Sequence, residues 1–187
     1  MRSTDEREVR GRRLVVAALL LTSLLLGACS GTPQRPLQTV DSVDIPRFMG
    51  DWYVIACIPT RIERHAYSAL ESYRQDADGR VLTTFSFRDG SFDGPQKRYQ
   101  PVGFIKDGSK GAVWGMQFIW PFKSDYRVLY LDRQYTQTVI GRQKRDYAWI
   151  MARTPTIPAA DYAQLTALLT AHGYDIAELR KVPQREP

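Results

Sequence analysis

The chain has 187 residues, of which 43% are apolar and 25% charged, a balance that suits one globular domain and excludes long internal disorder. Its formal charge is +6, but lysine and arginine are interspersed with aspartate and glutamate. Such a mixed surface carries no nucleic-acid footprint, so we expect no nucleic acid as partner. Ten tyrosines, seven phenylalanines and four tryptophans favour strands.

The first 28 residues differ from the rest of the chain. Arg10, Arg12 and Arg13 precede an apolar run, LVVAALLLTSLLLGA, over residues 14–28. A basic segment followed by such a run is typical of a secretory signal, and the run is shorter than the roughly 20 residues that a membrane-spanning helix needs. The sequence therefore predicts a signal peptide over residues 1–28, and without it the formal charge falls to +4.

The end of this segment, LLGAC, resembles the lipobox of bacterial lipoproteins, in which cleavage precedes a cysteine that is then acylated. The resemblance implies lipid attachment at Cys29 and a stable membrane anchor. Ser30 after the cysteine implies export to the outer membrane, with the domain facing the periplasm. An ordinary secretory signal is the alternative, and Arg12-Arg13 leaves the twin-arginine export route open.

Residues 29–45 are polar, contain two prolines and show no periodicity, which predicts a lipidated flexible tether. The folded domain is then expected over residues 46–183. It begins with a short helical turn, IPRFMG, that ends at Gly50.

Eight short strand-like runs follow the turn, separated by polar turn signals such as DADG and DGSKG. They cover residues 51–58, 66–74, 80–88, 97–106, 112–119, 126–132, 134–141 and 146–153. Many short strands with hairpin-length connections predict an all-β fold, either an up-and-down barrel or a sandwich. An eight-stranded barrel has an interior that side chains fill or that holds one small ligand.

The pattern changes to helical after residue 153. Pro158 suits a first helical turn, and Gly173 suits a left-handed C-terminal cap. Between them an apolar stripe recurs at helical spacing: Tyr162, Leu165, Leu168 and Leu169. We expect one helix outside the barrel, and the tail IAELRKV could add a ninth strand.

Three motifs, in order, resemble the lipocalin family: GDW at residues 50–52, LDRQY at 131–135, and an arginine at the end of the eighth strand. The stretches ERH, RDYAWIMARTPTI and HGYD resemble more closely the bacterial outer-membrane lipocalins of the apolipoprotein D-like branch. The resemblance covers about residues 45–182. It implies an eight-stranded antiparallel up-and-down β-barrel with a C-terminal α-helix packed outside.

The resemblance also implies structural roles for the motif residues Gly50, Trp52, Asp132, Tyr135 and Arg153. Trp52 would close the floor of the barrel, and Arg153 would lay its guanidinium on the indole face, a cation–π contact. Neither is expected to be catalytic.

Alternation along the strands predicts which side chains face the interior. An inward Trp52 places alternate residues of the first strand inward and Cys57 outward. The predicted cavity residues are Val54, Ala56, Ile58, Trp114, Met116, Phe118, Tyr126, Val128, Tyr130, Tyr147, Trp149 and Met151. The second, third, fourth and seventh strands stay unoriented, and an inward Glu71 would be costly unless paired.

This lining is apolar and aromatic with a few phenols, which suits an acyl chain. With the resemblance, it predicts a non-enzymatic carrier of fatty acids, such as palmitate, or of lysophospholipids, for lipid storage, transport or envelope maintenance. A structural or interaction lipoprotein with a filled barrel remains open. So does a thiol-dependent isomerase using Cys57, although no activating base is evident.

No catalytic residue, cofactor or metal site is predicted. The chain has two histidines, His65 and His172, far apart in sequence and without metal-binding spacing. We expect His172 to lie at a helix C-terminus and His65 in a surface loop. The sequence leaves a homodimer open.

Overall fold

The computed structural model describes residues 35–185. Its strands are β1 Gly50–Ile58, β2 Ala66–Gln75, β3 Val81–Asp89, β4 Gln96–Tyr99, β5 Val102–Ile105, β6 Val113–Ile119, β7 Phe122–Leu131, β8 Gln137–Gly141, β9 Ala148–Ala152 and β10 Arg180–Lys181. Its helices are α2 Ile45–Phe48, α3 Ala159–Ala171 and the 3₁₀ turn η1 Ile176–Glu178. The predicted signal peptide and Cys29 lie outside the described residues.

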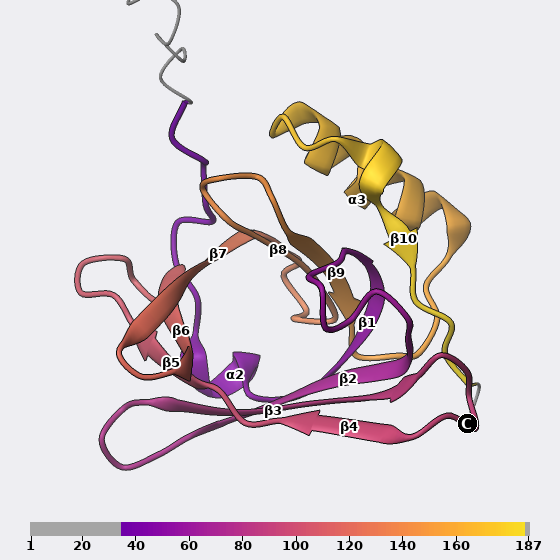
Figure 1. Ribbon diagram of the computed structural model, residues 1–187. Helices are drawn as coiled ribbons and strands as arrows, with labels where there is room; N and C mark the ends of the chain where they lie inside the picture. The colour runs from indigo at the N-terminus through magenta and orange to yellow at the C-terminus, as the bar shows by residue number, and fades with distance from the viewer. Residues whose placement is uncertain (1–34, 186–187) are drawn as a thin grey trace, which may run out of the picture. The chain divides into compact units, whose positions relative to one another are not determined.

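The strands form a closed antiparallel barrel, which confirms the predicted architecture (Figure 1). The order of paired strands is β1, β2, β3, β5, β6, β7, β8 and β9, and pairing between β1 and β9 closes the ring. The strands β4 and β5 are two parts of one predicted strand, interrupted at residues 100–101, and both pair with β3. The barrel wall therefore consists of eight strand positions. The short strand β10 pairs with Ala56 and Cys57 of β1, beyond the part of β1 that pairs with β2.

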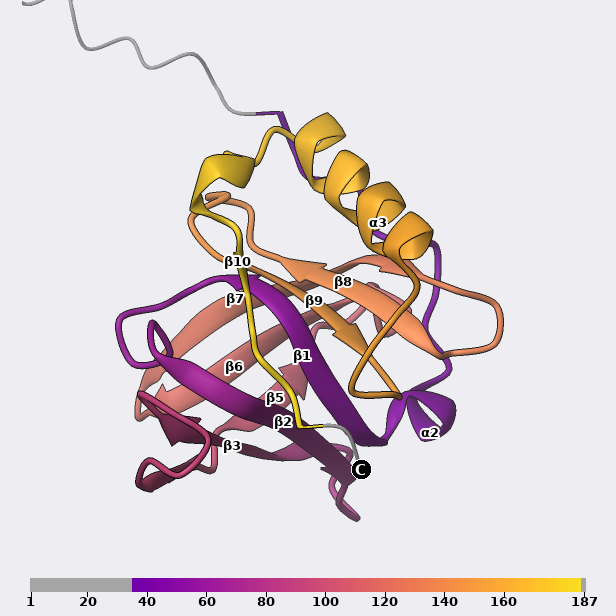
Figure 2. The same ribbon diagram turned by 90° about the vertical axis from the view of Figure 1, so that its right-hand side faces the viewer.

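The two ends of the barrel differ (Figure 2). At the closed end α2 lies under the start of β1, together with the β2–β3 turn. At the open end lie the β1–β2 loop, the β3–β4 turn, the β6–β7 hairpin and the β8–β9 turn. Since successive strands run in opposite directions, these four connections meet at one rim.

The helix α3 packs outside the barrel against β8 and β9 (Figure 2). Leu165 and Leu169 of its stripe are fully buried in an outer cluster that includes Ala148, Ile150 and Ala152. The small alanines let the helix approach the sheet, and the helix lies outside the barrel as predicted. Gly173 has a φ of 82° and ends the helix in the left-handed conformation.

Two β-bulges change the alternation that the sequence analysis assumed. In β1, Val54 pairs with Met151 and Ala56 pairs with Ile150, so Ile55 is an extra residue. The carbonyl of Ile55 accepts a hydrogen bond from the C-terminal strand segment, at 2.9 Å. Consecutive residues of β1 therefore face outward, and every later position in the strand is inverted.

The orientation predicted for the second half of β1 is wrong for this reason. Ala56 and Ile58, expected in the cavity, lie in the outer cluster, whereas Cys57, expected outside, is buried in the inner cluster. In β7 the extra residue is Leu129, so Tyr130, also expected inside, packs outside.

Residues 36–44, which the sequence analysis assigned to the tether, lie along the outside of the barrel. The side chains of Leu37 and Val43 are both 6% exposed. The backbone N–H of Val40 donates to Val128, and that of Val43 donates to Lys110. Attachment of the chain to the barrel therefore begins at least nine residues before the boundary expected at residue 46. Among the described residues, no helix is long and apolar enough to cross a membrane.

Candidate ligand-binding cavity

The floor of the barrel is a cluster of aromatic rings around Phe48 of α2. Its ring centroid lies 5.0 Å from that of Trp52, 5.5 Å from Trp114 and 5.7 Å from Tyr73. The indole N–H of Trp52 donates to the Phe48 carbonyl at 2.8 Å, and that of Trp114 donates to Gly111 at 2.6 Å. Both buried tryptophans are therefore satisfied and fixed in place.

Arg153 straps this floor from outside, as the family resemblance implied. Its guanidinium lies 3.8 Å from the Trp52 ring. It donates hydrogen bonds to five backbone carbonyls, those of Arg47, Phe48, Met49, Asp51 and Tyr135. Partial burial lowers the pKa of Arg153. The planar fork of donors joins α2, β1 and the β7–β8 turn.

The second motif shapes the β7–β8 turn. Asp132 accepts hydrogen bonds from the backbone N–H groups of Thr136 and Gln137, both at 2.7 Å. Tyr135, at a φ of 62°, accepts from the Asp44 N–H and carries the Arg47 guanidinium 4.2 Å above its ring. The motif residues Gly50, Trp52, Asp132, Tyr135 and Arg153 thus lie together at the closed end.

Above the floor the barrel encloses a cavity of about 580 Å³ that opens at the other end. This volume lies within the range of small-molecule sites, about 300–1,000 Å³. Its lining is Thr60, Arg61, Ile62, Glu63, Glu71, Tyr73, Phe85, Tyr99, Pro101, Met116, Phe118, Ile119, Ser124, Asp125, Tyr126, Ile140, Arg142, Tyr147, Trp149 and Met151.

Half of the twelve residues predicted for the cavity line it. They are Met116, Phe118, Tyr126, Tyr147, Trp149 and Met151. Three others, Val54, Trp114 and Val128, point inward but fill the layer of the inner cluster beneath the open space. The remaining three, Ala56, Ile58 and Tyr130, face outward because of the two bulges.

Besides Asp125, which pairs with Arg127, two carboxyl groups line the cavity, and sequence reasoning did not assign them to the site. Glu63 is 3% exposed and accepts hydrogen bonds from the Thr60 backbone N–H at 2.8 Å and the Trp149 indole at 3.2 Å. Burial raises its pKa. Burial and the neighbouring Glu63 raise the pKa of Glu71 to about 8. At neutral pH Glu71 is therefore protonated, so that it places no charge in the cavity.

Two phenols form the deep wall beside Glu71. The hydroxyls of Tyr73 and Tyr126 are hydrogen-bonded at 3.0 Å, and the Tyr126 ring stacks on Trp114 at 4.9 Å. Burial raises the pKa of both phenols well above the ordinary value. This wall is polar but uncharged.

Cys57 lies inside the barrel, contrary to the sequence analysis, and is 1% exposed. Burial, with the nearby Glu63, raises the pKa of its thiol to about 12. A nucleophilic thiol needs a depressed pKa or an adjacent base. The environment of Cys57 instead raises the pKa of the thiol and does not activate it as a nucleophile.

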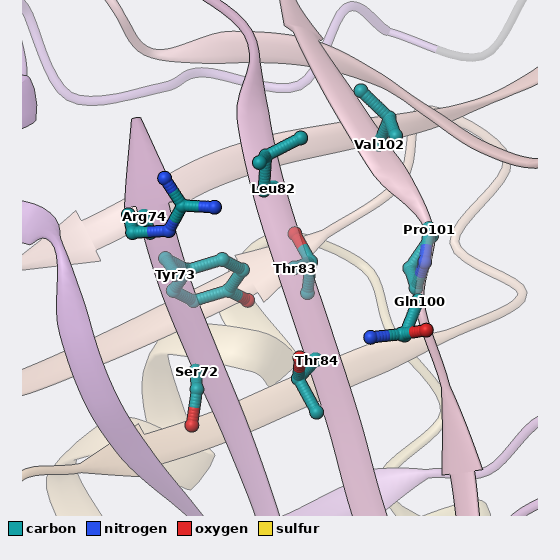
Figure 3. A pocket seen from close by; sticks show the side chains of 9 residues that line it. All are labelled: Ser72, Tyr73, Arg74, Leu82, Thr83, Thr84, Gln100, Pro101 and Val102. Carbon is teal, nitrogen blue, oxygen red and sulfur yellow. The ribbon is translucent and has the colours of Figure 1, made fainter. Parts of the chain in front are cut away.

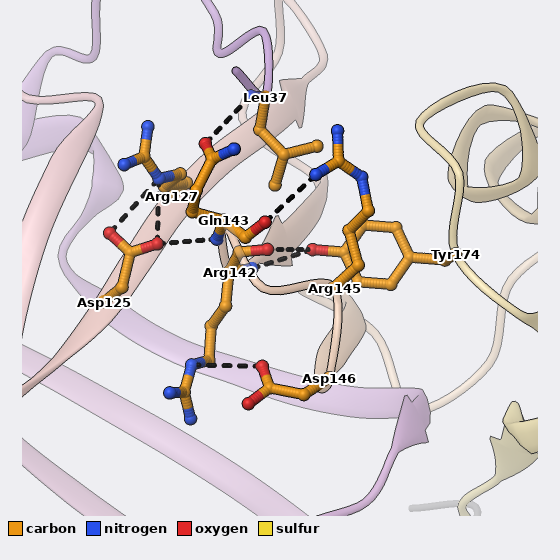
Figure 4. Close-up of polar contacts among 8 residues, drawn as sticks. All are labelled: Leu37, Asp125, Arg127, Arg142, Gln143, Arg145, Asp146 and Tyr174. Carbon is orange, nitrogen blue, oxygen red and sulfur yellow. Dashed lines mark hydrogen bonds and ion pairs between the residues drawn. The ribbon is translucent and has the colours of Figure 1, made fainter. Parts of the chain in front are cut away.

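The rim carries basic groups and is held by a hydrogen-bonded turn (Figure 4). The guanidinium of Arg142 lies 3.3 Å from Asp146 and 5.0 Å from the Tyr147 ring centroid. The hydroxyl of Tyr174 accepts from the Arg142 N–H at 2.7 Å and donates to its carbonyl at 2.9 Å. The segment after α3 thereby fixes the β8–β9 turn at the mouth.

A second hollow of about 350 Å³ lies on the wall where the fourth strand position is interrupted (Figure 3). It is lined by Ser72, Tyr73, Arg74, Leu82, Thr83, Thr84, Gln100, Pro101 and Val102. Tyr73 and Pro101 also line the main cavity, so the two spaces are neighbours.

The remaining candidates take no part in the cavity. His172 caps α3, with Nδ1 2.9 Å from the Leu168 carbonyl, and His65 is exposed beside β2. Over residues 35–185, no three histidine, cysteine, aspartate or glutamate side chains come close enough to hold a metal ion.

An antiparallel barrel with a plugged floor, an open mouth and an apolar interior is an architecture with room for one small molecule. The chain belongs to the lipocalin family: the model of a lipocalin-like domain matches residues 43–184.

Relatives of known identity agree with this membership. The outer membrane lipoprotein Blc of Citrobacter freundii is 32% identical over 170 residues, which cover 91% of this chain and 96% of that protein. Apolipoprotein D of Macaca fascicularis is 27% identical, covering 91% and 96%. Among solved structures, insecticyanin of Manduca sexta superposes with a TM-score of 0.65 at 16% identity, covering 81% of this chain and 86% of that one.

Proposed function

We propose that this chain is a membrane-anchored, non-enzymatic carrier of single-chain lipids, fatty acids or lysophospholipids, for lipid storage, transport or envelope maintenance. The observation that supports it most strongly is the apolar cavity of about 580 Å³ above a sealed floor. A filled barrel would leave no such space. Burial of an acyl chain there would stabilise the complex by about 0.8 kcal/mol per methylene.

The arrangement of polar groups suggests how the lipid would lie. The acyl chain would run toward the floor, between Met116, Met151 and Phe85. Its headgroup would remain at the mouth, where Arg61 and Arg142 line the opening. Guanidinium groups there suit a phosphate or a carboxylate. With Glu71 protonated, this residue presents no charge to the acyl chain in the deep half of the cavity.

The proposed location rests on the N-terminal sequence and on the relatives. Several of these are named outer membrane lipoproteins. Acylation at Cys29 would anchor this chain in the same membrane, facing the periplasm. No observation favours the thiol isomerase, because the Cys57 thiol is buried with a raised pKa.

Native mass spectrometry of protein extracted without delipidation tests the carrier function. We expect added mass equal to one fatty acid or lysophospholipid per chain. Mass analysis of the N-terminal peptide tests the anchor separately, and we expect an acylated Cys29. Ligand-free protein that also fails to take up oleate or lysophospholipid would refute the carrier function.

A further inference from the structure

Exposed apolar residues are concentrated in the β6–β7 hairpin. Within residues 35–185, large hydrophobic side chains that are well exposed number six, and four of them belong to this hairpin. These four, here called the apolar tip, are Phe118, Ile119, Trp120 and Phe122, with exposed fractions of 50%, 73%, 82% and 76%. A contiguous apolar surface of this kind marks an interaction site.

The apolar tip is continuous with the mouth of the cavity. Phe118 and Ile119 line the opening, and Ile62 of the β1–β2 loop, 40% exposed, lines it as well. A lipid leaving the cavity would therefore pass directly over these side chains. This position favours a partner that itself contains lipid.

The N-terminal segment reaches the barrel at the same end (Figure 4). The Leu37 N–H donates to the side chain of Gln143, in the β8–β9 turn at the mouth, at 2.9 Å. From there residues 37–43 follow the outside of the barrel toward the closed end, where the Val43 N–H donates a hydrogen bond to the Lys110 carbonyl. Only five residues lie between Cys29 and Arg35, and this limits their separation to about 20 Å.

Charges around the mouth suit phosphate headgroups. Arg61, Arg64, Lys123 and Lys144 are exposed in three of the four connections at this rim. Several acidic side chains at the same end are already paired, Asp125 with Arg127 at 2.8 Å and Asp146 with Arg142 at 3.3 Å. Glu63 is buried. The exposed charge beside the apolar tip is therefore mainly basic.

We propose that the apolar tip inserts into the headgroup region of a phospholipid bilayer, so that the barrel docks with its mouth against the membrane. Trp120 and Phe122 enter the interface, where aromatic side chains are favoured, and the basic residues contact phosphates. Lipid then exchanges between bilayer and cavity without crossing water. This orientation rests on the proposed anchor at Cys29.

Quenching of tryptophan emission by brominated acyl chains tests this docking. The full chain, purified from the membranes of the expressing cell, is reconstituted in vesicles of brominated phosphatidylethanolamine and phosphatidylglycerol. Trp52 and Trp114 are fully buried and Trp149 is partly buried, so Trp120 is the exposed reporter. We expect emission to be quenched relative to unbrominated vesicles, and most of this quenching to be lost in Trp120→Phe.

Two matched substitutions locate the contact. Phe122→Asp adds one negative charge to the apolar tip, and we expect it to abolish the quenching of Trp120. Ala77→Asp adds the same charge to the exposed β2–β3 turn at the closed end, and we expect full quenching to remain. Unchanged far-UV circular dichroism shows that both variants are folded.

Absent quenching of Trp120, with the N-terminal peptide acylated and native mass spectrometry still finding bound lipid, would overturn the docking and leave the carrier function intact. Equal loss of quenching in Ala77→Asp would also overturn it. A concentration-dependent blue shift of Trp120 emission without vesicles would instead assign the apolar tip to a second copy of the chain.

Discussion

At the scale of single residues, the deep part of the cavity contains titratable side chains that burial keeps in their neutral form. Glu71 pairs across the strands with Trp52, and an ionised carboxylate at this position would be poorly solvated. Its pKa of about 8 keeps it neutral at pH 7, beside the hydrogen-bonded phenols of Tyr73 and Tyr126. The polar atoms of the deep cavity thus remain compatible with an acyl chain.

Glu71 also makes stability depend on pH. The folded chain retains this proton up to about pH 8, whereas the unfolded chain releases it near the ordinary value of 4.5. Between these values the unfolded chain binds fewer protons, so the free energy of unfolding falls as pH rises. This contribution is fully present below about pH 4.5 and is lost as pH rises through 8.

The substitution Glu71→Gln should remove this dependence. Urea unfolding at pH 9 should find the variant more stable than the natural chain by about 1–3 kcal/mol, because the natural chain must then bury an ionised carboxylate. The advantage should shrink at pH 5. Glu178→Gln, which removes an exposed carboxyl of η1, is the control and should show no such trend. An equal difference at both pH values would contradict the assignment of the proton to Glu71.

The residues at the floor could be identified from the sequence, whereas Glu71 could not. The motifs around Trp52 and Arg153 require particular side chains, because the indole and the guanidinium fit one another in a fixed geometry. Glu71 stands in a strand, AYSALESYR, whose two faces are equally mixed. Its inward orientation follows from the register Trp52–Glu71, which a single sequence does not contain.

At the scale of elements, the strands were predicted closely and their faces less well. The spacing of turn signals marks strand ends, and all eight predicted strands are present. A bulge needs no special residue, and neither Ile55 nor Leu129 differs from its apolar neighbours. Both bulges occur in strands that are apolar on both faces, so hydrophobicity could not reveal that Ala56, Ile58 and Tyr130 face outward.

The β8–β9 turn offers a test of how the C-terminal segment supports the mouth. A methyl group at Gly141 would collide with the Tyr174 hydroxyl and with Leu129. We therefore expect Gly141→Ala to destabilise the chain by about 1–3 kcal/mol, the usual effect of overpacking. Gly115→Ala is the control, because the nearest atoms to a methyl group there would be those of the Lys123 side chain, at 3.2 Å or more.

Chemical unfolding of these variants, together with Tyr174→Phe, measures the coupling. The double variant Gly141→Ala/Tyr174→Phe should lose less stability than the sum of the single variants, since removing the hydroxyl relieves the collision. If the loss of stability in the double variant equals the sum of the two single losses, Tyr174 does not constrain the turn.

At the scale of the whole molecule, a floor, an apolar cavity and an apolar tip follow one another along the barrel axis. The sequence predicted the first two, through the family motifs and the aromatic strands. It did not reveal that residues 36–44 pack on the barrel, because Leu37, Val40 and Val43 are single apolar residues in a polar segment. Their burial depends on contacts with the barrel wall, which exists only after the strands have closed.

The measurement that tests the central claim most directly is a titration of delipidated protein with lysophospholipid, by calorimetry or by tryptophan fluorescence. We predict saturable binding of one lipid per chain. Met116→Trp fills the cavity and should abolish this binding, whereas Tyr130→Trp places the same side chain on the outer face and should leave it unchanged. Binding that persists in Met116→Trp, or no saturable binding by the natural chain, would contradict a lipid site inside the barrel.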